Sequence, residues 1–297
     1  MVRQRSAKPL SAGSIPAVAS ILTPTDFNFL ATVESHGWYH LAPFRWEKPV
    51  LHRIEILGGK PRKLEITFAD GALQVRGAKD SDELRAKLTR MFQLGVELGE
   101  FHEMAKLSPA HAWAADERFG RLLCGSTLFE DAVKIILTTN TMWRQTVRMA
   151  ELLVAKCGRG GAFPEPADIA RFSAEELQEE CRLGYRAKSI RKLAEVDVAS
   201  CQLSVAGQPV TGNRQPTTQE CFDAYRKLPG IGPYAAAHLL AMDGRHDFIA
   251  VDTEFRRFVR ETYHHGRKVS DAAMLRRYAK WGRWKYLAYW SELWNAR

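Results

Sequence analysis

The sequence is poor in cysteine, and none of its cysteines is spaced as a metal ligand. Among 297 residues it has five, namely Cys124, Cys157, Cys181, Cys201 and Cys221. They lie roughly twenty or more residues apart, whereas zinc sites and redox pairs need a CxxC spacing or a nearby histidine. This spacing excludes a compact cysteine-ligated site, and we expect reduced, structural thiols.

Long apolar runs are also missing. The chain has no stretch of about 18 apolar residues, the length that crosses a bilayer. Its first residues mix basic, small and proline residues and lack the continuous apolar core of a secretion signal. We therefore expect a flexible basic arm over 1–26 and a cytoplasmic protein, associated with the nucleoid if bacterial, with no membrane partner. An organellar transit peptide is the alternative for the arm.

Acidic residues are fewer than basic ones. The chain has 34 Asp and Glu against 43 Lys and Arg, which gives a net charge of +9 and an isoelectric point near 9.4. This balance favours a polyanionic partner, although a solvated basic surface produces the same excess. Hydrophobic residues make up 45% of the chain. That content is enough for a buried core, and the length suits two domains or one large one.

The pattern changes from strand-like to helical along the chain. HRIEILGG alternates between apolar and polar residues, and KLEITFADGALQVRG predicts two strands joined by an Asp-Gly turn. From SDELRAKLTRMF onward the spacing is helical, with Asp80 or Ser81 as the first cap. We predict an α+β protein, with a β-rich N-terminal domain with helix over 27–122 and a helical domain over 123–297.

The most informative stretch is LPGIGPYAAAHLLAMDGRHDFIAVDTEFRRF, from Leu228 to Phe258. It predicts a helix, a tight turn at Gly230 and Gly232, and a second helix that starts at Pro233. Because these glycines carry no side chain, main-chain N–H groups and the positive end of the second helix can approach a phosphate. After that helix an isolated carboxylate, Asp252, occupies an N-cap position.

This block resembles the helix-hairpin-helix GPD superfamily of DNA base-excision glycosylases, in which such a hairpin precedes a catalytic aspartate. The resemblance implies that Asp252 is catalytic, that the partner is double-stranded DNA with a damaged base, and that Gly230, Ile231, Gly232 and Tyr234 bind DNA. The order of the two domains is similar to that of the 8-oxoguanine and 3-methyladenine II branches, whose N-terminal domain is TBP-like. Bifunctional members carry a lysine where this chain has Tyr234, so the resemblance implies a monofunctional enzyme.

The same resemblance assigns residues to the opened duplex. Asn140, in the polar break of IILTTNTMWRQ, aligns with an asparagine that fills the gap left by the extruded nucleotide. Tyr185 and Arg186, in LGYRAKSI, match a tyrosine wedge and an arginine that contacts the orphaned strand. Gln145 stands where an arginine reads the orphaned base. A plain inter-helix loop and an ordinary surface Tyr-Arg pair are the alternative interpretations.

The C-terminal WGRWKYLAYWSELWNAR is rich in aromatic residues. Their helical spacing is typical of core packing, but the segment also resembles the base-pocket helix of the family. Trp284 aligns with a tryptophan of the alkylpurine pocket and Trp290 with a phenylalanine that stacks on oxidised guanine. Tyr286 replaces the glutamine that reads 8-oxoguanine, which weakens that substrate assignment. Aromatic faces suit either a cationic or a neutral base.

The resemblance also bears on cofactors. The main-chain carbonyls of Arg226, Leu228 and Ile231 correspond to positions that hold a monovalent cation, Na⁺ or K⁺, in relatives. Some relatives hold an iron–sulfur cluster after the catalytic helix, but no cysteine follows Cys221, so we expect no cluster and no required cofactor. We expect a monomer.

These observations converge on a monofunctional DNA N-glycosylase for a damaged purine, with alkylated bases slightly favoured over oxidised ones. Cleavage passes through an oxocarbenium-like sugar, so a carboxylate at Asp252 would stabilise the positive charge and orient water. Capping a helix is compatible with this role because it keeps the carboxylate ionised. Two alternatives stay open: a bifunctional glycosylase and lyase using an amine such as that of Lys188, and a non-catalytic hairpin module that only binds DNA.

Overall fold

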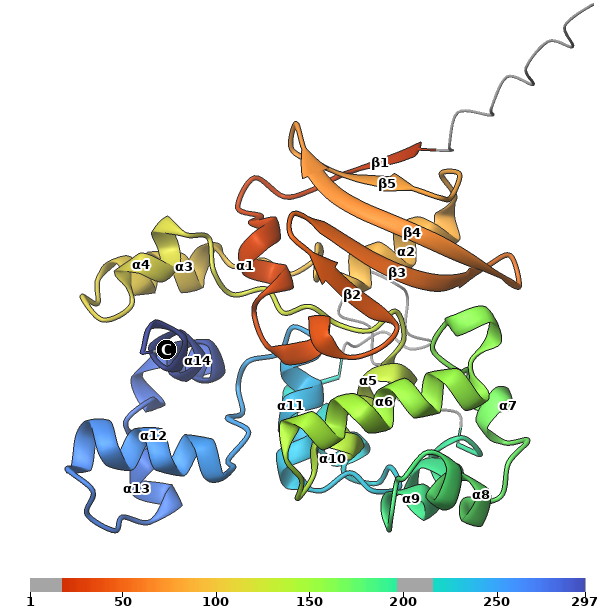
Figure 1. Cartoon of the computed structure of the whole chain (residues 1–297). Coiled ribbons are helices and arrows are strands. Elements are labelled where there is room, and N and C mark those ends of the chain that lie inside the picture. Colours follow the sequence, from red (N-terminus) through yellow and green to blue (C-terminus); the bar gives the residue numbers. More distant parts are fainter. Residues whose placement is uncertain (1–17, 197–215, 297) are drawn as a thin grey trace, which may run out of the picture.

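The computed structural model describes residues 18–196 and 216–296. It has an α+β fold, in which an antiparallel sheet lies on one side of the molecule and most of the helices lie on the other (Figure 1). The sheet has five strands in the order β1-β5-β4-β3-β2. The strands are β1 (Val18–Leu22), β2 (Phe44–Glu47), β3 (Val50–Leu57), β4 (Lys60–Ala69) and β5 (Ala72–Arg76).

The Asp-Gly hairpin predicted from the sequence is confirmed. β4 and β5 pair up to Ala69 and Ala72, and Asp70 and Gly71 between them have φ of 52° and 71°. Positive φ at both central residues is typical of a type I′ turn, whose twist matches that of the strands.

β1 corrects the expected extent of the N-terminal arm. Residues 18–22 lie inside the stretch 1–26 that we expected to be flexible, yet they pair with β5. The reason is that Ala19 and Ile21 alternate with outward residues and are buried in the core. The remainder of the expected arm, residues 1–17, lies outside the described residues.

Helices and short helical turns occur along the described chain, and most of them follow the sheet in sequence. They are α1 (Phe29–Val33), η1 (Gly37–His40), α2 (Asp82–Met91), α3 (Gly99–Lys106), α4 (Ala112–Asp116), α5 (Leu128–Thr138), α6 (Trp143–Cys157), η2 (Arg159–Gly161), α7 (Pro166–Ile169), α8 (Ala174–Glu180), α9 (Arg186–Leu193), α10 (Thr218–Tyr225), α11 (Pro233–Met242), α12 (Thr253–His264), α13 (Asp271–Arg276), η4 (Ala279–Trp284) and α14 (Lys285–Asn295). Ser81 caps α2, as predicted. Among the described residues, none of the helices is long and apolar enough to cross a membrane.

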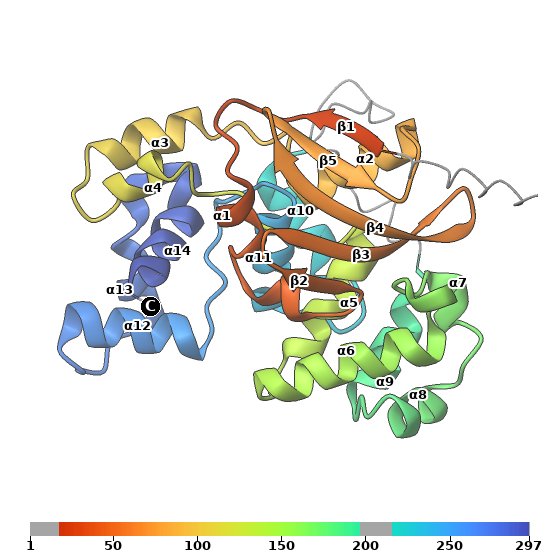
Figure 2. The same ribbon diagram turned by 45° about the horizontal axis from the view of Figure 1, so that its top comes forward.

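Helices from both ends of the chain pack together. α3 and α4 precede the domain boundary expected at 122, but they lie beside α14 rather than on the sheet (Figures 1 and 2). Phe101 of α3 contacts Trp281 with ring centroids 6.1 Å apart, and His111 Nε2 lies 3.2 Å from the carbonyl oxygen of Ala288. The helical part of the molecule therefore includes residues 99–116, because their apolar faces are buried by the aromatic C-terminal segment.

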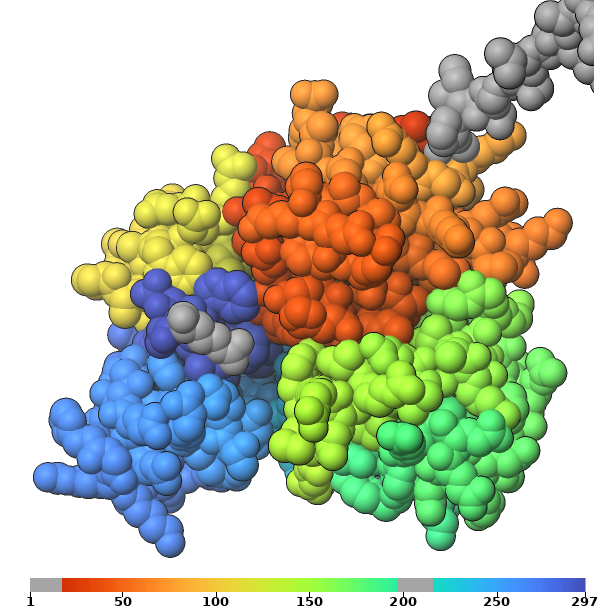
Figure 3. Space-filling model, viewed as in Figure 1, coloured from red at the N-terminus to blue at the C-terminus, as the bar shows by residue number. Residues whose placement is uncertain are grey.

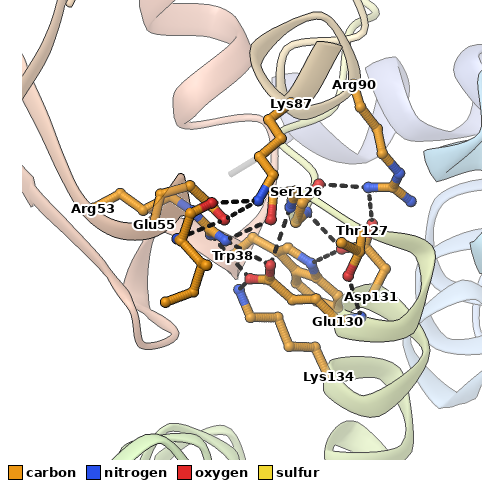
Figure 4. A network of polar contacts seen from close by, with 12 residues as sticks. Trp38, Arg53, Glu55, Lys87, Arg90, Ser126, Thr127, Glu130, Asp131 and Lys134 are labelled. Carbon is orange, nitrogen blue, oxygen red and sulfur yellow. Dashed lines mark hydrogen bonds and ion pairs between the residues drawn. The ribbon is translucent and has the colours of Figure 1, made fainter. Parts of the chain in front are cut away.

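Buried ion pairs join the sheet to the helices (Figure 4). Arg53 of β3 donates to both carboxylate oxygens of Glu130 on α5, at 3.0 and 2.7 Å, and Lys134 lies 2.6 Å from the same carboxylate. Nearby, Arg90 of α2 donates to Asp131 at 2.6 Å. The four cysteines in the described residues, Cys124, Cys157, Cys181 and Cys221, are buried free thiols, as expected, whereas Cys201 lies outside the described residues.

Candidate functional site

The predicted helix, turn and helix are present as α10, the turn at Gly230 and Gly232, and α11. Gly232 is the N-cap of α11, Pro233 is its first residue, and the amide of Ile231 donates to the carbonyl oxygen of Leu228 at 3.1 Å. The two glycines differ. Gly230 has φ +79°, and a Cβ there would lie 2.7 Å from Cβ of Ser189, whereas a Cβ at Gly232 would meet nothing within 4 Å. Gly230 is thus required by the fold, and Gly232 leaves open space before the amides of α11.

Asp252 is the N-cap of α12. Its Oδ1 accepts a hydrogen bond of 2.7 Å from the amide of Phe255. Burial raises the pKa of this carboxyl above its ordinary value, while the amide of Phe255 opposes that shift. The carboxylate is therefore fixed in direction and only partly hydrated, which strengthens its field on any group beside it.

Tyr234 lies in the first turn of α11, close enough to Asp252 for that charge to act on its phenol. Burial and then the charge of Asp252 raise the pKa of the Tyr234 phenol to about 12. The phenol is consequently neutral at physiological pH and is no amine nucleophile. Tyr234 is the residue at the position where bifunctional members of the resembled family carry lysine.

Asn140 and Tyr185 come together from two loops. Asn140 has φ +46°, and its Nδ2 donates to the Tyr185 hydroxyl at 3.4 Å. The Tyr185 side chain is 59% exposed, as an inserting wedge requires. Arg186 differs from our expectation of a contact with the orphaned strand, because its guanidinium is buried and donates to the carbonyl oxygens of Thr139 and Asn140. In this arrangement Arg186 holds the Asn140 loop in place.

Two apolar residues beside this loop were not singled out from the sequence. Met142 is 61% exposed and Trp143 is 42% exposed, at the start of α6. Gln145, in the same first turn of α6, accepts a hydrogen bond of 2.6 Å from Thr141 Oγ1. Met142 and Trp143 could have been identified from the sequence, because they are adjacent large apolar residues inside an otherwise polar break.

The C-terminal aromatic residues pack against one another and against the core, as their helical spacing predicts, and their role as a base pocket stays a prediction. Trp284 is 4% exposed and contacts Phe101 and His246, so it belongs to the core. Tyr286 stacks on Trp290 with centroids 5.8 Å apart. Burial and then the charges of neighbouring groups, among them Tyr289, Tyr234 and Asp252, raise the pKa of Tyr286.

Buried histidines form one aromatic cluster with Tyr234 and Tyr286. No local motif identifies these histidines in the sequence. His238 lies one turn after Tyr234 on α11, with ring centroids 5.9 Å apart, and it also contacts Tyr286 at 6.2 Å. His36 and Trp38 reach it from η1, at 6.1 and 5.8 Å. This aromatic cluster is therefore built from both halves of the chain.

The hairpin carbonyls are compatible with a cation. The carbonyl oxygen of Leu228 accepts one hydrogen bond, and among the bonds of the described residues none ends on the carbonyl oxygens of Arg226 or Ile231. These oxygens keep lone pairs for an ion such as Na⁺ or K⁺. No group of three or more His, Cys, Asp or Glu side chains in the described part of the chain is arranged to hold a metal ion.

The surface is hollowed between α12 and α6 (Figure 3). α12 begins at the edge of this groove, which places Asp252 there, and the loop that carries Asn140 precedes α6 on the other side (Figure 1). The N-terminus of α12, with the Asp252 carboxylate, and the loop with Asn140 and Tyr185 thus lie on the two sides of one groove.

The chain is similar to known DNA repair proteins. It matches the family described as "HhH-GPD superfamily base excision DNA repair protein" over residues 133–283, which is just over half of the chain. No curated protein matches it in sequence. Among solved structures, the 3-methyladenine DNA-glycosylase from Archaeoglobus fulgidus has a TM-score of 0.73 and 19% identity, with 94% of this chain and 98% of that chain covered. The Clostridium acetobutylicum 8-oxoguanine glycosylase/lyase, solved with double-stranded DNA containing cytosine opposite 8-oxoG, has a TM-score of 0.70 and 18% identity, with 92% of both chains covered. These likenesses show the fold, and the family match shows that the chain belongs to the HhH-GPD superfamily of base excision DNA repair proteins and is a DNA glycosylase.

Proposed function

We propose that this protein is a monofunctional DNA N-glycosylase that releases an alkylated or oxidised purine from double-stranded DNA. The observation that carries the proposal is the partly buried carboxylate of Asp252 beside the phenol of Tyr234. A carboxylate at this place stabilises the positive sugar as the glycosidic bond breaks, and no lysine stands where the bifunctional members carry one.

The reaction that we propose is a hydrolysis. The bond between C1′ of the sugar and the base nitrogen breaks, and the base leaves with the electron pair. Water adds to C1′, and its proton passes to Asp252, which the Phe255 amide holds in position, and from there to solvent. A cationic alkylated base leaves as a neutral molecule, whereas an uncharged oxidised base leaves as an anion and takes up a proton from solvent. The hairpin amides bind a phosphate near the lesion, while Tyr185 and Asn140 fill the opened stack. A monovalent cation on the carbonyls of Arg226, Leu228 and Ile231 would add positive field at that phosphate.

The test is an assay of the purified protein on duplexes that each carry one damaged purine. We expect release of the free base and an intact abasic strand, which breaks only after alkali or heat. Borohydride should trap no protein–DNA adduct. A trapped adduct would instead require an amine such as that of Lys188, and absence of base release from every duplex would leave a hairpin module that only binds DNA.

A further inference from the structure

His36 carries a buried N–H group that has no acceptor. The residue precedes η1, is 6% exposed, and its Nδ1 accepts a hydrogen bond of 3.2 Å from the amide of Trp38. Burial, and then the nearby His238 and Lys134, hold the pKa of His36 well below its ordinary value, so the ring is neutral. A neutral imidazole whose Nδ1 accepts carries its proton on Nε2. That Nε2 is buried without a partner.

This donor lies in the aromatic cluster beside Asp252. His238 links it to Tyr234 and Tyr286, with centroid distances of 6.1, 5.9 and 6.2 Å. The hydroxyl of Tyr286 is also buried without a partner. Buried polar groups in folded proteins almost always have partners, and leaving one without costs about 1–3 kcal/mol. Two such groups around His238 indicate that a ligand supplies the missing partners.

The backbone around His36 is held from both sides. Trp290 Nε1 donates to the carbonyl oxygen of Ser35 at 2.9 Å, and the Ser35 hydroxyl accepts from the amide of Leu123 at 3.1 Å. On the other side Trp38 Nε1 donates to Asp131 at 2.9 Å. These bonds anchor η1 to α14 and α5. The backbone on both sides of the imidazole is therefore fixed, which preorganises the direction of the ring.

We infer that His36 Nε2–H donates to an acceptor on the extruded base, with the Tyr286 hydroxyl as a second contact, and that the substrate is a neutral purine that carries a carbonyl oxygen. An N–H donor complements a carbonyl oxygen. It disfavours a cationic alkylated purine, because the positive end of the N–H dipole would point toward the positive charge of that base. The surrounding rings stack on any base and do not discriminate. Recognition at this site rests on the proposed glycosylase function and narrows its substrate class.

The experiment compares single-turnover base release by the wild-type protein and His36→Asn. Asparagine keeps the cap on the Trp38 amide but is too short to place a donor where Nε2 lies. The probes are duplexes with one 8-oxoguanine or one hypoxanthine, and methylated DNA that carries 3-methyladenine. We expect the wild-type protein to prefer the two carbonyl-bearing bases and H36N to release them about 10- to 100-fold more slowly. Affinity for an abasic-site duplex, which has no base to contact, should not change.

His40→Asn is the matched control, because His40 is an exposed histidine on the same turn, and it should leave release and affinity unchanged. If H36N does not fold, His36→Phe is used instead, because phenylalanine keeps an aromatic ring at this position and removes the N–H donor. Its base release is then compared with that of the wild-type protein on the same probes. Equal release by wild type and the His36 variant, or a wild-type preference for 3-methyladenine, overturns the inference while the glycosylase proposal stands. Absence of release from every probe contradicts the proposed function itself and removes the basis of the inference.

Discussion

At the scale of single residues, Asp252 combines a structural bond with the proposed chemistry. One carboxylate oxygen caps α12 through the Phe255 amide, and the group is partly buried next to Tyr234. The cap needs only an oxygen acceptor, whereas stabilising a positive sugar needs the negative charge. A neutral side chain of the same shape separates the two.

We predict that Asp252→Asn loses base release by on the order of 100-fold or more while the protein keeps its stability, since asparagine caps helices as well as aspartate does. Single-turnover release and thermal unfolding measure the two effects. Affinity for an abasic-site duplex should stay near the wild-type value. Glu254→Gln, two residues after Asp252 in the first turn of α12, is the control and should retain release. Wild-type turnover in D252N would remove Asp252 from the mechanism.

The residues that could be identified from the sequence are those whose environment is local. Asp252 follows its hairpin at a fixed distance, and Tyr185 begins α9 within a short motif. The orientation of Arg186 could not be predicted, because its partners are carbonyl groups 46 and 47 residues away in sequence. His36 was missed for the same reason: its neighbours come from α5, α11 and α14.

At the scale of elements, the hairpin between α10 and α11 contains two glycines that look equivalent in sequence but differ in structure. Gly230 needs a left-handed backbone and has no room for a Cβ against Ser189. Gly232 has an extended backbone, with φ −87° and ψ −176°, and open space around it. The first is therefore needed for folding, and the second is free to serve the approach of a phosphate.

We predict that Gly232→Val weakens binding to every duplex alike, because a branched side chain blocks the α11 amides, while stability falls by no more than about 1 kcal/mol from the poorer cap. Gly230→Val should instead destabilise the fold by about 1–3 kcal/mol or more. Binding isotherms at two salt concentrations and urea unfolding distinguish the two. Gly99→Val, at an exposed and unobstructed first turn of α3, is the control. Unchanged affinity of G232V would show that the turn is purely structural.

Local signals also explain which elements could be predicted. The Asp-Gly turn and the Pro-started α11 are encoded by the residues that form them. β1 could not be predicted, because a short strand at a sheet edge exists only through its pairing with β5. The placement of α3 and α4 against the C-terminal segment depends on contacts between residues 177 and 180 positions apart in sequence, which periodicity does not reveal.

At the scale of the whole molecule, a fully buried ion network fixes the sheet against α5 (Figure 4). Glu130 is its centre, with Arg53 on one side and Lys134 on the other, and the three side chains are at most 1% exposed. Burial alone would raise the pKa of Glu130, but the two cations hold it well below its ordinary range. Helical periodicity predicts that Glu130 and Lys134 lie on one helix. It does not predict that Arg53, from the sheet, forms an ion pair with Glu130.

We predict that Glu130→Gln lowers the free energy of unfolding by about 3–5 kcal/mol, since it leaves the buried Lys134 without its counterion and removes one of the two carboxylates that pair with Arg53. Urea unfolding at neutral pH is the measurement. Glu103→Gln removes the exposed partner of Lys106, a pair with side chains 73% and 55% exposed, and should change stability by less than about 1 kcal/mol. Equal effects of the two substitutions would show that the buried network contributes no more than a surface pair.

The buried histidines make the stability of the molecule depend on pH. Burial lowers the pKa of His238 to about 4 and that of His246 to about 3. Because these folded-state values lie below the unfolded value near 6.5, the unfolded chain binds more protons between them. The contribution of the two neutral histidines to the free energy of unfolding is therefore fully present above pH 6.5 and is lost as the pH falls toward 4.

We predict that the free energy of unfolding falls by up to about 1.4 kcal/mol per pH unit for each of these histidines as the pH is lowered below 6.5. His246→Phe provides the internal comparison. Its ring lies between Trp284 and Tyr286, and both of its nitrogens are buried without partners, so phenylalanine should preserve the contacts and remove the titration. Urea unfolding of both proteins at pH 7.5, 6.0 and 5.0 should give the variant a slope shallower by up to that amount, together with equal or greater stability at neutral pH. Parallel slopes would mean that His246 is solvated or already protonated in the folded protein, and the acid sensitivity would then have to arise from the carboxylates.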